Sequence, residues 1–358
     1  MDIKEKAKML PSSPGVYLMK DLSGHIIYVG KSKNLKNRVQ SYLYHSKNHT
    51  KKVEKLVNHL RDFDYILTDT EFEAFILECK LIKEFQPMYN RVMKTPKSYT
   101  YIKIRKDTFE LTSSRNTNDG YLYFGPYTNK KTVEEAVNGI KEFYQINCNN
   151  PLNNHTPCFN YSIGKCMGIC FKNSAIEQYH KVLNRTIAFL QGKDKTILEE
   201  MEQKMINAAS TLDFELAAEI KEWLKSVRAL YKKGKVIQFT KENNYIVVAE
   251  FLEDNKLKLF LIRGNHILYK EIFKLNNINL KELCSLIRSS ILQDFKDISL
   301  PKDIRKDEID EAQIIYSYLN SNACEYFIIP EEWLTSDTNT KIEKSIHDLL
   351  DTRLLELY

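Results

Sequence analysis

The sequence predicts an α+β protein made of several domains. Its 358 residues exceed one ordinary domain and suggest two or three. Strand-like and helical patterns alternate in the first hundred residues, a pair of helical segments follows in the middle, and strand patterns return near residue 235. With 43% hydrophobic and 28% charged residues, the composition is that of a globular protein. We expect domains over residues 1–95, 96–192, 193–234 and 235–358.

The first domain is expected to begin with a β-hairpin. Val16–Met19 and Ile26–Val29 have strand patterns, and turn-forming residues separate them. Asn34 is a candidate N-cap for a helix that runs to about Tyr44. The next elements are expected to be a helix, a strand and a helix ended by Gln86-Pro87, over Lys51–Leu60, Phe63–Thr68 and Glu71–Glu84.

The middle and the end of the chain also show strand and helix patterns. In the middle we expect strands at Tyr99–Arg105 and Tyr121–Phe124, then helices at Lys131–Phe143, Ser174–Gln191, Thr196–Ala209 and Asp213–Tyr231. The last two of these helices are expected to form an antiparallel pair. From Lys235 onward we expect strands at Val236–Phe239, Tyr245–Phe251, Lys256–Ile262 and Ile267–Phe273, then helices at Leu280–Leu292 and Glu308–Asn320.

Basic residues are concentrated at the front of the chain. Residues 1–100 hold 18 Lys and Arg against 11 Asp and Glu, whereas residues 235–358 hold 16 against 21. This asymmetry favours a polyanion such as nucleic acid as the partner of the front half.

The sequence predicts neither a membrane protein nor an exported one. No apolar stretch approaches the roughly 18 residues needed to cross a bilayer. Met1 to Leu10 is charged and lacks the apolar core of a secretion signal. The expected compartment is the cytoplasm, where the four clustered cysteines of the seven suggest a metal rather than disulfides.

Phenols and cations gather in the first domain. Tyr17 and Tyr28 can share one face of the hairpin, and Arg38 and Tyr42 share a helix face, with Lys31 just after the second strand. Cations hold phosphate oxygens and a phenol can pass or share a proton, so this set suits a phosphate-handling site. The alternative is a core of packed aromatics with a solvated basic helix face.

Glu78 is a candidate metal ligand. In the helix expected over Glu71–Glu84, its neighbours one turn away on both sides are all apolar, so its carboxylate is expected to be buried. A buried carboxylate needs either an ion pair, to Arg38 or Lys31, or a hard cation such as Mg²⁺. Glu73, by contrast, is expected to face water.

The first domain resembles the GIY-YIG nuclease domain. The residues of this chain that carry the resemblance are, in order, Gly15-Val-Tyr17, Tyr28-Val-Gly30-Lys31, Arg38, Tyr42, Glu78 and Asn90. The segments that flank them look like those of the UvrC family. The resemblance implies an α/β sandwich with one Mg²⁺, or Mn²⁺, on Glu78, and hydrolysis of a DNA phosphodiester. It implies Tyr17 as general base, or as a group that only positions water. Arg38 and Lys31 would steady the phosphate, and Tyr28, Tyr42 and Asn90 would complete the site.

Four cysteines follow in a polar stretch. The spacing of Cys148, Cys158, Cys166 and Cys170 departs from the paired spacing of structural zinc sites, and four thiolates also suit an iron–sulfur cluster. Zinc and metal-free thiols stay open as alternatives. The stretch is similar to the cysteine-rich part of the UvrC family, which implies a [4Fe–4S] cluster. The other cysteines, Cys79, Cys284 and Cys324, are expected to be small core residues.

The helical pair contains Leu212-Asp-Phe-Glu-Leu-Ala-Ala218, which resembles the UVR motif. The resemblance implies that Leu212, Phe214, Glu215 and Ala218 bind the helicase UvrB, with UvrA acting upstream. The alternative is ordinary helix packing. An isolated hairpin of this length lacks a core of its own, so we expect it to have a docking partner. We also expect it to be a docking unit separate from the nuclease fold.

Residues 235–358 look like the UvrC segment that precedes a second, RNase-H-like nuclease domain. That domain is expected to be missing here, which makes the chain similar to the single-nuclease Cho proteins. By family analogy the function is a 3′ incision in damaged double-stranded DNA beside a lesion. The alternatives are a UvrB-binding regulator without nuclease activity, and a GIY-YIG nuclease of a mobile element.

Overall fold

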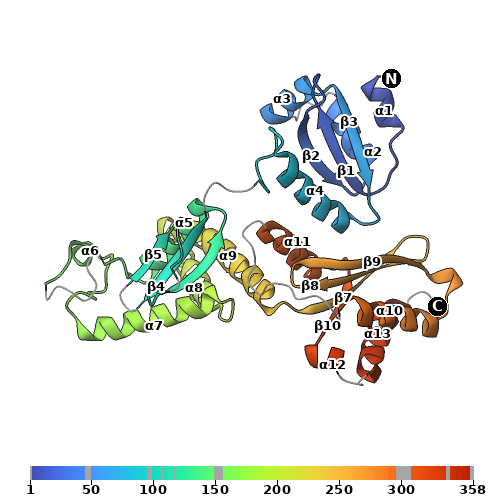
Figure 1. The fold of residues 1–358 in the computed structure, drawn as a ribbon. Coiled ribbons are helices and arrows are strands. Elements are labelled where there is room, and N and C mark those ends of the chain that lie inside the picture. Colours follow the sequence, from blue (N-terminus) through green and yellow to red (C-terminus); the bar gives the residue numbers. More distant parts are fainter. Residues whose placement is uncertain are drawn as a thin grey trace. The chain divides into compact units, whose positions relative to one another are not determined.

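A computed structural model describes residues 2–44, 50–94, 99–105, 108–116, 118–148, 156–295, 308–335 and 339–354 (Figure 1). The chain forms two compact units. Met1–Thr95 and Thr240–Tyr358 make up unit 1, and Pro96–Phe239 makes up unit 2. Among the described residues, no helix is both long and apolar enough to cross a membrane. The expected α+β architecture is confirmed, while the four domain boundaries stay a prediction.

The first segment of unit 1 is a small sheet covered on both faces. Its elements are α1 Ile3–Lys8, β1 Gly15–Lys20, β2 Ile26–Ser32, α2 Leu35–Leu43, α3 Lys51–His59, β3 Asp62–Leu67 and α4 Glu71–Phe85. The strands are antiparallel in the order β2-β1-β3. Because side chains alternate along a strand, Tyr17 and Met19 pack with α1, α2 and α3, whereas Val16 and Leu18 pack with α4.

Helices α2 and α4 begin at residues whose side chains cap them. The side chain of Asn34 accepts a hydrogen bond from the backbone N–H of Asn37 at 3.0 Å, as expected for the N-cap of α2. Thr70 caps α4 in the same way, through the N–H of Glu73. Gln86 ends α4 in the left-handed conformation, directly before Pro87.

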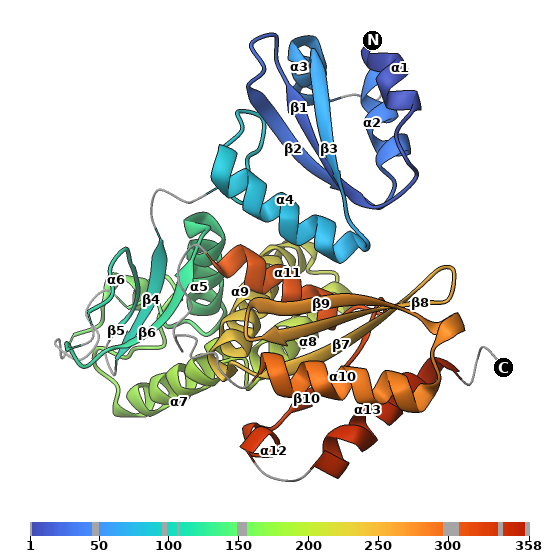
Figure 2. The ribbon, with the colours of Figure 1, turned by 45° about the vertical axis from the view of Figure 1, so that its right-hand side comes forward.

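The second segment of unit 1 is a four-stranded antiparallel sheet with helices on both faces (Figure 2). Its elements are β7 Tyr245–Leu252, β8 Lys256–Arg263, β9 His266–Lys274, the 3-10 turn Leu275–Asn277, α10 Leu280–Asp294, α11 Ile309–Leu319, β10 Glu325–Ile329, α12 Glu331–Thr335 and α13 Asn339–Leu354. The strand order is β10-β7-β8-β9. Helices α10 and α13 share a buried core with one face, and α11 meets the other through Tyr318 beside Phe260.

Unit 2 places a three-stranded sheet against long helices. Its elements are β4 Thr100–Arg105, β5 Thr108–Thr112, β6 Leu122–Tyr127, α5 Lys130–Phe143, α6 Phe159–Ser162, α7 Asn173–Leu190, α8 Thr196–Ser210 and α9 Phe214–Glu242. One core joins the sheet to α5, α7, α8 and α9, with Ile102, Ile140, Leu183, Met201 and Leu224 buried in it. The helical pair α8–α9 therefore shares its core with the rest of unit 2.

One expected strand is wrong. Val236–Phe239 lies inside α9, a helix of 29 residues in all. Val227, Leu230 and Ile237 are buried along it at helical spacing, so packing of this face overrides the weak strand preference of the β-branched residues. The sequence patterns also missed α1, β5, β10, α6, α12 and α13, which are short or lie near the end of the chain.

Candidate functional site

Three tyrosines meet on the α2 side of the first sheet. The hydroxyls of Tyr17 and Tyr42 lie 3.0 Å apart, within hydrogen-bond distance. The ring centroids of Tyr17, Tyr28 and Tyr42 are 5.9–6.4 Å from one another. Tyr17 and Tyr42 are buried and Tyr28 is partly exposed, so the cluster opens to solvent at Tyr28.

Gly30 makes room for this cluster. It lies directly opposite Tyr17 in the β1–β2 pairing. A Cβ atom at Gly30 would come within 2.4 Å of the Tyr17 hydroxyl oxygen. A side chain here would therefore displace the Tyr17 phenol, which explains why the motif has glycine at this position.

Burial keeps the phenols of Tyr17 and Tyr28 protonated. It raises the pKa of Tyr17 well above its usual value, with further contributions from Tyr42 and Tyr28. It also raises the pKa of Tyr28. The charge of Arg38 lowers the pKa of both tyrosines, but by less than burial raises it. At neutral pH the Tyr17 hydroxyl is therefore a hydrogen-bonding group rather than a phenolate.

Glu78 is half-buried at the middle of α4, and its charge acts on the nearby Tyr28. Its Oε1 accepts a hydrogen bond from the backbone N–H of Lys31 at 3.1 Å. Burial raises the pKa of the Glu78 carboxyl, although the Lys31 N–H and the charges of Lys31 and Arg38 oppose this. Among the described residues no ion pair to Glu78 is present. A carboxylate in this setting has the chemistry of a ligand for a hard cation.

Lys31 and Arg38 lie at the edge of the cluster. The Lys31 ammonium pairs with Glu71 at 2.5 Å and lies over the ring of Phe75, so it is not the counter-ion of Glu78. Arg38 is exposed, and its guanidinium lies 5.1 Å from the centroid of the Tyr42 ring. Burial alone would lower the pKa of Arg38, but the phenols of the three tyrosines raise it, so the side chain is a permanent cation.

Asn90 is close to the cluster but uses its amide on the backbone. Its Oδ1 accepts from the N–H of Val29 at 3.0 Å, and its Nδ2 donates to the carbonyl of Val29 at 2.9 Å. This pair of bonds ties the segment after α4 to β2, between Tyr28 and Gly30.

Glu73 does not face water, and that expectation is wrong. Its side chain is 5% exposed and pairs with Lys258 at 3.3 Å and with Lys270 at 2.7 Å. Both lysines belong to the second segment of unit 1, so local sequence spacing could not reveal them.

Three of the four clustered cysteines meet in unit 2. The sulfur atoms of Cys148, Cys158 and Cys170 all lie within 4.8 Å of one another. Those of Cys148 and Cys158 are 3.9 Å apart. Cys166 is buried next to them, interacts with Cys158, and accepts a hydrogen bond from the N–H of Gly168. The intervening asparagines at 149, 150, 153 and 154 lie outside the described residues.

The clustered and isolated cysteines have different surroundings. Burial would raise the pKa of Cys158, but the N–H of Tyr161 and the neighbouring thiols outweigh it and lower the pKa. Burial raises the pKa of Cys166. It raises the pKa of Cys79 and of Cys324 to about 12, and also raises that of Cys284. The isolated thiols therefore resist ionisation.

An all-thiol donor set fits either zinc or an iron–sulfur cluster. In a tetrahedral zinc site with Zn–S bonds of about 2.3 Å, the sulfur atoms lie about 3.8 Å apart. The Cys148–Cys158 distance matches that value. A cluster of four irons is larger than one ion, so its thiolates would lie further apart than the 3.9 Å between the sulfur atoms of Cys148 and Cys158.

The turn of the α8–α9 hairpin exposes apolar side chains. Leu212 is 73% and Phe214 64% exposed, and Glu215 and Ala218 are exposed beside them. Leu212 has a φ of 63°, in the left-handed region that non-glycine residues seldom adopt. The four residues with the predicted docking role thus lie together at the exposed end of the hairpin.

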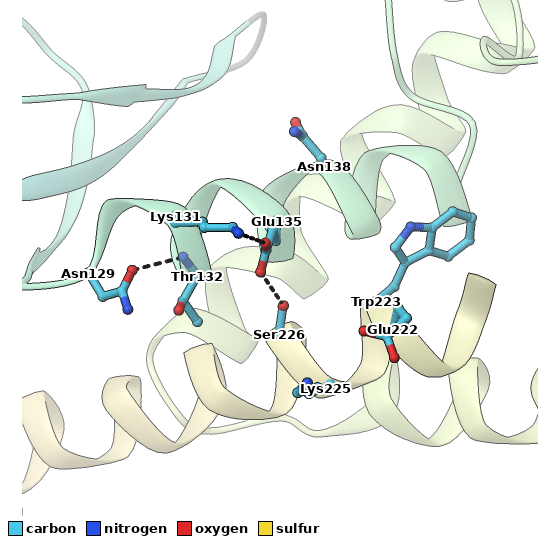
Figure 3. Close-up of a pocket in the computed structure, with 9 residues that line it drawn as sticks. All are labelled: Asn129, Lys131, Thr132, Glu135, Asn138, Glu222, Trp223, Lys225 and Ser226. Carbon is cyan, nitrogen blue, oxygen red and sulfur yellow. Dashed lines mark hydrogen bonds and ion pairs between the residues drawn. The ribbon is translucent and has the colours of Figure 1, made fainter. Parts of the chain in front are cut away.

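A pocket of about 620 Å³ lies elsewhere, between α5 and α9 (Figure 3). Its polar side chains pair with one another: Glu135 accepts from Ser226 at 3.0 Å and lies 3.8 Å from Lys131. None of the predicted site residues lines it, and we assign it no ligand.

Sequence spacing missed two charged residues at the tyrosine cluster. Lys52 in α3 places its ammonium 6.0 Å from the ring centroid of Tyr28. Glu71, in the first turn of α4, binds Lys31. Both contacts join segments that only the tertiary fold brings together, so no local signal could have identified them.

Comparison with known families places three matches along the chain. Residues 13–91 match a UvrC-like GIY-YIG domain, residues 99–189 the middle domain of the UvrC/Cho excinucleases, and residues 195–230 the UvrB/UvrC motif.

Individual relatives agree with these matches. The chain is 38% identical over 333 residues to UvrABC system protein C of Clostridioides difficile, covering 89% of this chain and 55% of that protein. It is 35% identical over 353 residues to the protein of the same name from Clostridium tetani, covering 96% and 54%. A solved structure, the magnesium-bound GIY-YIG N-terminal endonuclease domain of UvrC from Thermotoga maritima, is 42% identical. The match covers 25% of this chain and 96% of the chain in that structure, with a TM-score of 0.23.

Proposed function

Because the chain belongs to the UvrC family and spans about half the length of the curated relatives it matches, we propose that it is an endonuclease of nucleotide excision repair. Residues 13–91 would hydrolyse one phosphodiester of damaged double-stranded DNA with Mg²⁺ or Mn²⁺. The supporting observation is the half-buried Glu78 carboxylate, which has no ion-pair partner among the described residues and lies beside the tyrosine cluster. We expect this chemistry in the cytoplasm.

In this proposal each residue has a task set by its surroundings. Glu78 would hold the metal, which when bound polarises a phosphate oxygen and acidifies a water molecule. Tyr17, protonated and hydrogen-bonded to Tyr42, would hold the attacking water in line rather than remove its proton as a phenolate. Arg38, exposed and charged, would bind the non-bridging oxygens of the phosphate.

Lys31 and Asn90 would act differently from each other. The Lys31 ammonium would exchange Glu71 for a DNA phosphate, since exposed ion pairs contribute little free energy. Asn90 would support β2 from behind, and thus keep Tyr28 and Gly30 in position, rather than touch the substrate.

The position of the cut tests this function. We expect purified protein with UvrA, UvrB and Mg²⁺ to nick a lesion-bearing duplex on the 3′ side of the lesion. An end label on each strand in turn maps the nick on a sequencing gel. The same duplex without a lesion, and the same mixture without UvrB, are the controls. A nick only on the 5′ side, or none at all, would contradict the proposal.

The exposed turn of the hairpin is the proposed UvrB site. Phe214→Ala should weaken UvrB binding by about 2 kcal/mol, or roughly 30-fold, if the aromatic side chain fills a pocket at the centre of the interface. Because Phe214 is 64% exposed, the variant should unfold at the wild-type temperature. Titration calorimetry with UvrB measures the affinity.

A matched control for this experiment is Leu122→Ala, which removes another exposed apolar side chain of unit 2, on β6. It should leave UvrB affinity unchanged. Equal affinities for wild type and Phe214→Ala would exclude Phe214 from the interface.

We also propose that Cys148, Cys158, Cys166 and Cys170 together bind a [4Fe–4S] cluster, which would move the thiolates apart from the metal-free spacing described above. The four-thiol donor set and the convergence of three sulfur atoms support a metal centre here. The centre would stabilise a polar segment that has little core of its own.

A further inference from the structure

Helix α4, which carries Glu78, is buried on two faces. One face packs on the first sheet, where Ala74 and Ile82 join Val16 and Val29. The opposite face bears Phe72 and Cys79, 5% and 0% exposed. The residues around this second face belong to residues 240–358, which lie beyond the three family matches but in the same compact unit.

Aromatic stacking anchors the first turn of α4. The ring of Phe72 stacks on that of Tyr318 in α11, with centroids 3.9 Å apart and planes inclined by 5°. Phe72 also meets the edge of Phe260 in β8, at 5.2 Å. The three rings bury a large apolar area at one end of the helix.

A buried ion network lies beside these rings. Lys258 of β8 is 4% exposed and places its ammonium 2.6 Å from Asp69 and 3.3 Å from Glu73. Lys270 of β9 adds a second cation 2.7 Å from Glu73. Since a buried charge is costly without a partner, neither the lysine nor the glutamate could stay buried if the two segments separated.

A third contact fixes the other end of α4. Lys83 and Glu311 of α11 lie 3.1 Å apart, with side chains 16% and 17% exposed. Glu78 lies halfway between this pair and Phe72. The helix is therefore held at both ends, with the candidate metal ligand midway.

We propose that residues 240–358 position the metal-binding helix of the nuclease. Glu78 and Glu71 both project from α4 toward Lys31 on β2, so a shift of α4 would move the metal ligand and the partner of the phosphate-binding lysine together. Phe72, Glu73, Lys83, Lys258, Glu311 and Tyr318 are positioning residues on this assignment. It rests on the proposed function for the meaning of Glu78, but not for the docking itself.

Charge reversal at the Lys83–Glu311 pair tests the proposal. Lys83→Glu and Glu311→Lys should each speed hydrogen exchange of the α4 amides by about tenfold, because each places like charges in a mostly buried contact. Each should also weaken Mg²⁺ binding, measured by titration calorimetry without DNA, several-fold. The double variant, which restores opposite charges, should recover most of both losses. A role confined to stability would not move Mg²⁺ affinity and restore it in this pattern.

Lys8→Glu is the matched control, since Lys8 pairs with Glu5 at the exposed surface of the same domain. It should change neither quantity. Wild-type exchange and Mg²⁺ affinity in both single variants would overturn the proposal, and so would a wild-type protein that binds no Mg²⁺. Variants that lose and regain Mg²⁺ affinity as expected, in a protein that nicks no DNA, would support the positioning role and reject the nuclease function.

Discussion

Glu78→Gln is expected to reduce Mg²⁺-dependent incision by about 10³-fold or more. One electrostatic group in an active site is already worth about 10²–10³, and this substitution removes the proposed charge for the metal. The amide keeps the size of the side chain, and its oxygen can still accept the N–H of Lys31. DNA binding should therefore persist. Incision rates on the lesion duplex, with a filter or gel assay for binding, measure both effects.

The direction in which Glu78→Gln changes the stability of the metal-free protein follows from the pKa of Glu78. Burial raises the pKa of Glu78, so the folded protein holds the proton more tightly than the unfolded chain does. Above that pKa the ionised carboxylate costs stability in the metal-free protein, and the neutral amide removes the cost. Glu78→Gln should thus unfold at the same or a higher temperature in the absence of metal. The raised pKa also affects metal binding, because a protonated carboxyl does not bind Mg²⁺. As the pH is lowered, the Mg²⁺ affinity of the wild type should therefore begin to fall at a higher pH than it would with an ordinary glutamate ligand.

Glu84→Gln is the matched control, because Glu84 is exposed on the same helix. It should incise at the wild-type rate. Near-normal incision by Glu78→Gln in Mg²⁺ would remove Glu78 as the metal ligand.

Serine at any one of Cys148, Cys158, Cys166 or Cys170 is expected to release the metal and lower the melting temperature of unit 2. Metal binding supplies folding free energy to a segment with few core residues, so loss of one ligand should loosen all of it. Anaerobically purified wild type should be brown and contain iron. Iron analysis measures the loss of metal, visible absorbance the loss of colour, and calorimetry the lower melting temperature.

The three isolated cysteines provide controls. These residues, Cys79, Cys284 and Cys324, lie outside the cluster. Serine at any one of them should leave the iron content at the wild-type value. A colourless wild type with one zinc per chain would reject the iron–sulfur cluster and keep a structural metal. Freely reactive thiols, no metal and unchanged stability in all four variants would reject both.

Local patterns predicted most elements and the members of the tyrosine cluster. Strand alternation places Tyr17 and Tyr28 on one face, and helix spacing does the same for Arg38 and Tyr42, so both relations can be read from the sequence. Glu78 could be singled out because all of its helical neighbours are apolar.

What the sequence could not predict depends on contacts between distant segments. Glu73 has polar neighbours in the chain and was expected at the surface, but Lys258 and Lys270 bury it from nearly two hundred residues away. Val236–Phe239 has strand-forming residues, but its packing belongs to α9. In both cases the tertiary environment outweighs local preference.

The division of unit 1 into two chain segments has a consequence for biosynthesis. The docking face of α4, with Phe72 and Cys79, leaves the ribosome more than 144 residues before its cover begins, since all of residues 96–239 come between. At roughly 5–20 residues per second, that interval is about 7–30 s. During it the first segment of unit 1 leaves the apolar face with Phe72 and Cys79 uncovered, and the carboxylates of Asp69 and Glu73 lack their lysine partners. We expect these charges to keep water at the uncovered face, so that the residues which later form the ion network would also oppose aggregation of the unfinished chain.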